Sequence, residues 1–150
     1  MNFIPDKPIL TGDQILPYIP QRMPMVFVDT FYGTIDDSQY SSLLVTPELI
    51  FTENGMLLDI GIIEFLTQSG YVWFSYREKE ILGKSDLEIT KGYLCKIKNM
   101  KVTDTPHVGE RICSKLDVGY YSSTFSTLHM IAYTADRVLA EGDFDVLSLN

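Results

Sequence analysis

The second half of the chain alternates between apolar and polar residues. Four alternating runs, at residues 93–102, 111–121, 124–134 and 138–147, are separated by short polar turns. Alternation with a period of two is typical of strands that have one buried face, and short connections favour antiparallel pairing of consecutive strands. The pattern therefore predicts a four-stranded antiparallel meander.

A long helix is predicted before these strands. Residues 57–82 contain no proline and carry apolar side chains on nearly every side of a helical projection. A helix that is apolar all round is a buried one. Residues 76–80 are polar, which places them at the surface, and Gly83 favours the end of the helix. A loop at residues 47–55 leads into it.

The first fifty residues predict a short helix and a hairpin. Residues 11–19 favour a helix that Pro20 ends. Residues 25–32 and 40–45 favour strands, with a turn at residues 36–37 between them. Hairpin, long helix and meander together predict an α+β fold in which an antiparallel sheet wraps around one long central helix.

Length and composition limit the number of domains. A chain of 150 residues, 45% of them hydrophobic, suits one compact domain over residues 1–150. Asp59, Glu64 and Gln68 interrupt the longest apolar stretch well before the ~20 residues that a membrane span requires. The first residues lack the basic start and apolar core of a secretion signal. We therefore expect a cytoplasmic protein with no membrane partner.

The charge of the chain bears on its partners. A formal net charge of -8 disfavours binding to phosphate backbones, so no nucleic-acid partner is expected. Against this acidic background four lysines form a local basic run: Lys91, Lys96, Lys98 and Lys101. They are candidates for docking an acidic carrier protein or a phosphate-bearing arm. The alternative is a solvated strand face that aids solubility.

Two cysteines, Cys95 and Cys113, fall on strands that the meander places side by side around a turn near residues 105–108. Pairing about that turn sets Cys95 opposite Val118, so the thiols are about five residues out of register and too far apart for a disulfide. We expect both to be reduced residues of the core. No histidine or aspartate lies at ligand spacing from them, so no metal site is predicted.

Four stretches of the sequence resemble one family of enzymes. They are IPQRMPMVFVD at 19–29, EFLTQS at 64–69, IKNMKV with VGE at 97–102 and 108–110, and VLAEG at 138–142. Their order and spacing resemble those of bacterial 3-hydroxyacyl-(acyl-carrier-protein) dehydratases, and IFTENG at 50–55 is similar to the loop of a divergent Bacteroidetes branch. The resemblance covers most of the chain and implies a hotdog fold.

Glu64 falls on the catalytic acid of that family, which removes water from a 3-hydroxyacyl thioester and forms a trans-2-enoyl thioester. In the family, a histidine in the loop before the helix takes the proton next to the thioester carbonyl. Here the corresponding positions are Leu49, Ile50 and Phe51, none of which can carry a proton. Glu64 would then serve as both base and acid, and apolar surroundings would favour its neutral form. The alternative is an ordinary helix residue whose carboxyl is satisfied by a backbone or tyrosine partner.

The resemblance implies further site residues around Glu64. Gln68 lies one helical turn later, where its amide orients Glu64 or the thioester; the alternative is an ordinary hydrogen bond from helix to loop. The backbone near Gly61, at the start of the helix, would donate to the thioester carbonyl. Phe51, Asn54 and Gly55 would form a tunnel wall contributed by the partner chain.

The implied substrate is an acyl group on a phosphopantetheine arm, supplied by an acyl carrier protein or as a CoA thioester, and no other cofactor is implied. We expect a homodimer or higher even oligomer, or a mixed dimer with another hotdog subunit, because a lone sheet leaves an edge strand and half a tunnel open. His107 and His129 match no catalytic position of the family, and we expect both to be structural.

Three functions follow from this reasoning. The first is a dehydratase that uses Glu64. The second is a noncatalytic partner that binds an acyl chain or pairs with an active dehydratase, and the missing histidine is its main support. The third is a thioesterase in which a helix carboxylate activates water, which the EFLTQS segment and the segment at 19–29 favour least.

Overall fold

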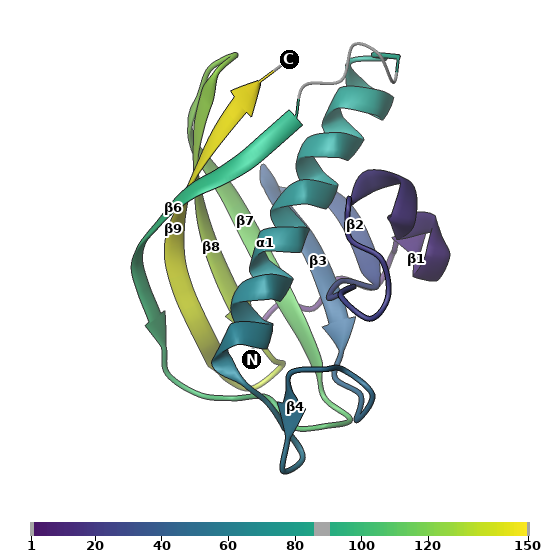
Figure 1. The fold of residues 1–150 in the computed structure, drawn as a ribbon, viewed down its shortest axis with the longest axis vertical. Coiled ribbons are helices and arrows are strands. Elements are labelled where there is room, and N and C mark those ends of the chain that lie inside the picture. The colour runs from purple at the N-terminus through teal and green to yellow at the C-terminus, as the bar shows by residue number, and fades with distance from the viewer. Residues whose placement is uncertain (1, 86–90, 150) are drawn as a thin grey trace.

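Among the described residues, seven strands form one antiparallel sheet that curves around a long helix, as Figure 1 shows. The structure is a computed structural model that describes residues 2–85 and 91–149. In the described residues the strand order is β1-β2-β3-β7-β8-β9-β6, and every neighbouring pair is antiparallel. The predicted α+β plan is confirmed. The strands are β1 (Leu10–Thr11), β2 (Thr30–Ile35), β3 (Ser38–Leu44), β6 (Lys91–Val102), β7 (Arg111–Tyr121), β8 (Phe125–Tyr133) and β9 (Val138–Leu149).

The long helix α1 (Asp59–Tyr76) continues into a π-helical turn, η2 (Arg77–Ile81). Gly83 follows with a φ of 67°, a left-handed conformation that suits glycine and ends the helix as predicted. The helix is not buried on all sides: Ile60, in its first turn, is 54% exposed. The prediction of complete burial is wrong because the sheet covers only one side of α1. No helix in the described part of the chain is long and apolar enough to cross a membrane.

The segment before the helix differs in detail from its prediction. Gly12–Tyr18 forms a 3-10 helix, η1, and β2 begins at Thr30, later than predicted. The loop at 47–55 contains a small hairpin, β4 (Thr52–Glu53) and β5 (Met56–Leu57). Its turn residues, Asn54 and Gly55, have φ values of 53° and 75°, the left-handed pair that a tight two-residue turn requires.

The position of β6 corrects the predicted meander. β7, β8 and β9 are consecutive neighbours, but β6 pairs with β9 at the edge of the sheet instead of with β7. Cys95 and Cys113 therefore do not lie on adjacent strands. Both are free thiols; Cys113 is buried, but Cys95 lies at a bulge in β6 and is exposed, so its assignment to the core is wrong. Alternation predicts a strand's faces but not its neighbours.

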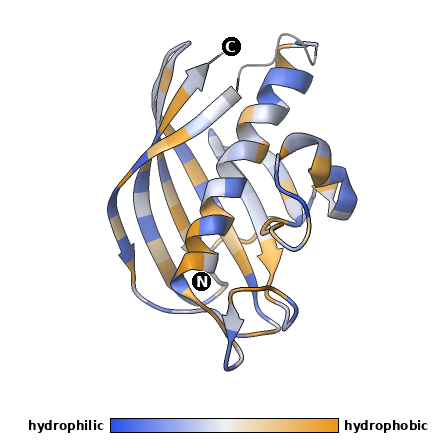
Figure 2. Cartoon of the chain, viewed as in Figure 1, coloured by the Kyte–Doolittle hydropathy of each residue, from blue (hydrophilic) through white to orange (hydrophobic). Residues whose placement is uncertain are grey.

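The core fills the space between the sheet and α1. Along β8, Ser126, Leu128, Met130 and Ala132 are buried, while the residues between them are only half-buried on the opposite face. Figure 2 shows the corresponding alternation of hydrophobic and hydrophilic residues along the long strands. The even-numbered residues of β8 therefore face the helix, and this face forms part of the site described next.

Candidate functional site

The side chain of Gln68 joins α1 to the segment that precedes β2. Its Nε2 donates to the carbonyl oxygen of Met25 at 2.7 Å, and its Oε1 accepts from the amide of Phe27 at 2.7 Å. Nε2 also donates to Oε1 of Glu64 at 2.8 Å. Gln68 is fully buried, and these bonds use both of its amide hydrogens. Gln68 thus orients Glu64 and bonds to a loop, and no amide hydrogen remains for a thioester.

These bonds also explain the late start of β2. The backbone groups of Met25 and Phe27 are satisfied by a side chain of the helix, so they need no partner on a neighbouring strand. The same contact fixes the distance between α1 and this segment. The carboxyl of Glu64 is therefore hydrogen-bonded to the side chain that joins α1 to this segment.

Glu64 is half-buried on α1. Thr67 and Tyr71 follow it by about one and two helical turns and lie on the same side of the helix. Burial, and then the nearby charge of Glu64, raises the pKa of Tyr71. The Tyr71 phenol and the Glu64 carboxyl therefore lie close enough to interact electrostatically.

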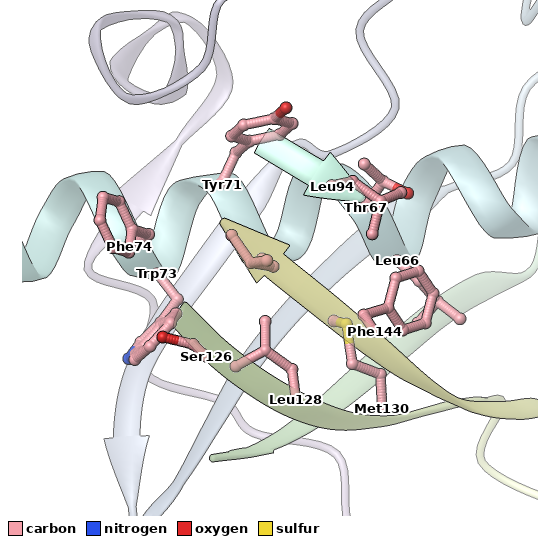
Figure 3. A pocket seen from close by; sticks show the side chains of 12 residues that line it. Leu66, Thr67, Tyr71, Trp73, Phe74, Leu94, Ser126, Leu128, Met130 and Phe144 are labelled. Atoms are coloured by element: carbon pink, nitrogen blue, oxygen red, sulfur yellow. The ribbon is translucent and has the colours of Figure 1, made fainter. Parts of the chain in front are cut away.

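An apolar pocket lies between α1 and strands β6, β8 and β9, as Figure 3 shows. Most of the wall is hydrocarbon or aromatic, from residues that include Leu66, Trp73, Leu128, Met130, Phe144 and Val146. An apolar wall of this kind suits an alkyl or aromatic group in preference to a polar one.

Glu64 does not itself line this pocket. Thr67 and Tyr71 do, and both are only half-buried, so they lie towards its mouth. Glu64 is one turn closer to the start of the helix than Thr67, a rise of about 5 Å. A molecule with an apolar tail in the pocket and a polar end outside it can therefore present that end to the carboxyl.

The structure gives Gly61 a different role from the predicted one. Its amide donates to the carbonyl oxygen of Leu58 at 2.9 Å and is not an open donor for a thioester. A Cβ at this position would lie 2.5 Å from Cδ1 of Leu57, which is fully buried. The glycine is required by packing at the start of α1, and the prediction of a free Gly61 amide is corrected.

The loop residues predicted to form a tunnel wall lie on the small hairpin and just before it. Phe51 stacks on Phe27 of the same chain, with ring centroids 5.4 Å apart. Asn54 and Gly55 are the exposed turn of the β4–β5 hairpin. Phe51 therefore supports the segment that Gln68 binds, whereas a contact of these residues with a partner chain stays a prediction.

The predicted basic run follows the edge strand β6. Lys98 pairs with Asp145 of β9, Nζ to Oδ2 at 3.1 Å, while Lys96 and Lys101 are exposed. The side chain of Lys91 lies outside what the structure describes. Lysines on an edge strand also discourage unwanted strand pairing, which is a structural reason for their presence. Docking of a carrier protein stays a prediction.

The two histidines occupy structural positions. His129 faces away from α1, and its Nδ1 lies 2.7 Å from Oδ1 of Asp143; this hydrogen bond is the main reason that its pKa is raised. The side chain of His107 is exposed, and its backbone amide donates to Glu110. In the described part of the chain, neither imidazole hydrogen-bonds Glu64.

Sequence reasoning found the pairing of Glu64 with Gln68 but missed the pocket and the small hairpin. The Asn54-Gly55 pair is a known hairpin signal and could have revealed the hairpin. The pocket has no comparable signal, because its walls come from four elements that are distant in the sequence.

Neither a protein-family model nor a curated protein matches the chain. Solved structures do. The dehydratase heterocomplex ApeI:P from Xenorhabdus doucetiae matches with a TM-score of 0.77 and 18% identity over 91% of both chains. The chain has a hotdog fold.

Thioesterases share this hotdog architecture. A mutant of thioesterase PA1618 from Pseudomonas aeruginosa has a TM-score of 0.61 and 10% identity over 81% of both chains. A hypothetical thioesterase from Streptococcus pneumoniae, solved with coenzyme A, has a TM-score of 0.61 and 12% identity over 80% of this chain and 84% of its own. At these identities the likeness establishes the fold alone, so the chemistry must come from the residues of this chain.

Proposed function

We propose that this hotdog protein removes water from a 3-hydroxyacyl thioester, with the carboxyl of Glu64 as both base and acid. The observation that carries the proposal is the position of this carboxyl. Gln68 holds its Oε1 at 2.8 Å, one helical turn before the residues at the mouth of an apolar pocket. Burial of an acyl tail in that pocket is favourable by about 25 cal/mol per Å² of apolar surface.

The proposed reaction needs one proton carrier. Gln68 occupies Oε1 of Glu64, so Oε2 takes the proton from C2 of the substrate. The electron pair of the C2–H bond forms the double bond to C3 while the C3–O bond breaks. The carboxylic acid then returns the proton to the departing hydroxide, which leaves as water, and the carboxylate is restored.

A second subunit and a carrier belong to the same proposal. The edge strand β6 and the exposed Ile60 at the start of α1 offer a surface that another hotdog subunit would cover. We propose a homodimer or a mixed dimer, with the acyl group delivered on phosphopantetheine by an acyl carrier protein or as a CoA thioester. Lys96 and Lys101 are the exposed cations proposed to meet an acidic carrier.

A noncatalytic partner subunit is the second candidate. This candidate is favoured because neither histidine is hydrogen-bonded to Glu64 in the described residues, so no histidine base accompanies the carboxyl there. Such a subunit would still bind an acyl chain in the pocket, but an active dehydratase would supply the chemistry. The ApeI:P structure is itself a dehydratase heterocomplex.

One assay separates these functions. The purified protein is incubated with a 3-hydroxyacyl N-acetylcysteamine thioester and, separately, with the matching trans-2-enoyl thioester, and both interconversion and thiol release are followed. We expect interconversion in the wild type and its loss by about 10²-fold or more in Glu64→Gln. The matched control is Glu48→Gln, at an exposed glutamate outside the site, which should retain full activity.

The outcomes are distinct. Thiol release without interconversion would favour a thioesterase. If neither reaction occurs but the thioesters bind, the noncatalytic subunit is favoured. Equal activity of Glu64→Gln and the wild type would contradict the proposal, provided that both proteins unfold at the same urea concentration.

A further inference from the structure

The inner wall of the pocket carries one buried hydroxyl that has no partner. Ser126 of β8 lines the pocket and is 1% exposed. Its Oγ has no hydrogen-bond partner among the described residues. The hydroxyl of Thr67, by contrast, donates to the carbonyl oxygen of Ile63 at 2.9 Å. A buried hydroxyl without a partner is unfavourable in a folded protein, and native structures retain few of them.

The strand directs this hydroxyl towards the helix. Ser126 shares the inward face of β8 with Leu128 and Met130, which also line the pocket. Figure 3 shows Ser126 at the end of the pocket where Trp73 lies, whereas Thr67 lies near the other end. A chain that enters past Thr67 would therefore bring its distal part to Ser126.

We propose that Ser126 selects an acyl group that carries a hydrogen-bonding oxygen, a hydroxyl or a carbonyl, on the part buried in the pocket. The inference rests on the proposed acyl site and names its substrate class. An unsubstituted alkyl chain leaves the Ser126 hydroxyl unpaired. A chain with an oxygen at the right position gains a hydrogen bond that offsets the loss of its own hydration.

The chain offers a built-in reporter of pocket occupancy. Trp73 is its single tryptophan and lies in the pocket wall. The emission of an indole responds to the polarity of its surroundings, so titration with a ligand can be followed by intrinsic fluorescence. The probes are alkanoyl and ω-hydroxyalkanoyl N-acetylcysteamine thioesters, compared as pairs of equal length over a series of lengths.

We expect the wild type to prefer the hydroxylated member by about fivefold at the length that reaches Ser126. In Ser126→Ala the preference should reverse, because the hydroxyl of the probe is then buried without a partner. Ser114→Ala is the matched control. Ser114 is also 1% exposed with an unpartnered Oγ, but it lies on β7 and does not line the pocket.

Each result decides something. Equal affinities within every pair, in the wild type as in Ser126→Ala, would overturn the inference while leaving the acyl site intact. No binding of either probe at any length would overturn both the inference and the proposed function. The comparison of paired probes in the wild type holds even if Ser126→Ala fails to fold. A reversed preference in Ser114→Ala as well would also overturn the specific role of Ser126.

Discussion

Gln68 satisfies polar groups that this fold would otherwise bury without partners. Its amide meets the carbonyl oxygen of Met25, the amide of Phe27 and a carboxyl oxygen of Glu64. The first two bonds hold the helix against the preceding segment, and the third orients the proposed catalytic group. Stability and site geometry therefore depend on the same side chain.

Replacing Gln68 by leucine should lower the free energy of unfolding by about 2–4 kcal/mol, because two backbone groups are left buried without partners. Urea denaturation at neutral pH measures this. Glu64→Gln is the comparison, since its side-chain oxygen still accepts from Gln68 and its cost should stay below about 1 kcal/mol. A Gln68→Leu protein as stable as Glu64→Gln would contradict the structural role of Gln68.

Glu110 is a second residue whose surroundings lead to a prediction. Its carboxylate accepts from both terminal nitrogens of Arg137, at 2.7 and 2.8 Å, and from the backbone amide of His107. The bonds from Arg137 are the main reason that the pKa of Glu110 falls to about 2. Glu110 is the acidic residue of the VGE segment, directly before β7. Its ion pair with Arg137 joins this segment to the turn before β9.

A depressed pKa implies a definite dependence of stability on pH. The contribution of Glu110 is present above its ordinary value of 4.5 and is lost as the pH falls towards about 2. We expect Glu110→Gln to be less stable than the wild type at neutral pH, with the difference shrinking below about pH 4. Thermal unfolding across this range tests it, and a difference independent of pH would contradict it.

The elements of the fold differ in how far the sequence predicts them. The predicted ends of β7 agree with the structure to the residue, and those of the helix formed by α1 and η2 agree within about two residues. Such agreement is expected because periodicity is a local property of the sequence. The place of β6 next to β9 was missed, since it depends on packing and not on alternation. At the site, the spacing of Glu64 and Gln68 predicted their contact. The bonds of Gln68 to residues 25–27 and the pocket are long-range features without a local signal.

Two glycines of α1 should respond oppositely to alanine. In Gly61→Ala the new methyl group would meet the buried Leu57 at 2.5 Å, whereas in Gly70→Ala it would lie 3.6 Å from Leu128, an ordinary contact. We expect Gly61→Ala to destabilise by about 1–3 kcal/mol and Gly70→Ala to stabilise by up to about 1 kcal/mol through helix propensity. Urea denaturation measures both, and a stabilised Gly61→Ala protein would contradict the packing role of Gly61.

At the scale of the whole molecule, the hotdog fold leaves an apolar side chain of α1 and one edge of the sheet exposed. Ile60 on α1 is 54% exposed close to the start of the helix, and β6 has a neighbour on one side only among the described strands. An exposed apolar side chain and an open sheet edge are both features that association would bury. The proposed second subunit would occupy this side.

Light scattering after size-exclusion chromatography should therefore give about twice the mass of one chain. Ile60→Glu would place a charge in the proposed interface and should shift the protein towards the monomer. Ile81→Glu is the matched control, because Ile81 is 69% exposed at the opposite end of the helix. Equal effects of the two substitutions, or a monomeric wild type that forms no mixed dimer, would contradict the proposed assembly.

The two outer strands of the sheet are very unequal in length. β1 spans Leu10–Thr11, whereas β6 spans Lys91–Val102. Fibre growth by strand addition needs two receptive edges on every copy. If two copies joined along β6, both long edges would be consumed, and each outer side would end in the two-residue β1 and the part of β2 (Thr30–Ile35) that β1 does not cover. These short outer edges disfavour the addition of further copies. Concentrated solutions of this protein should therefore accumulate closed dimers instead of cross-β filaments.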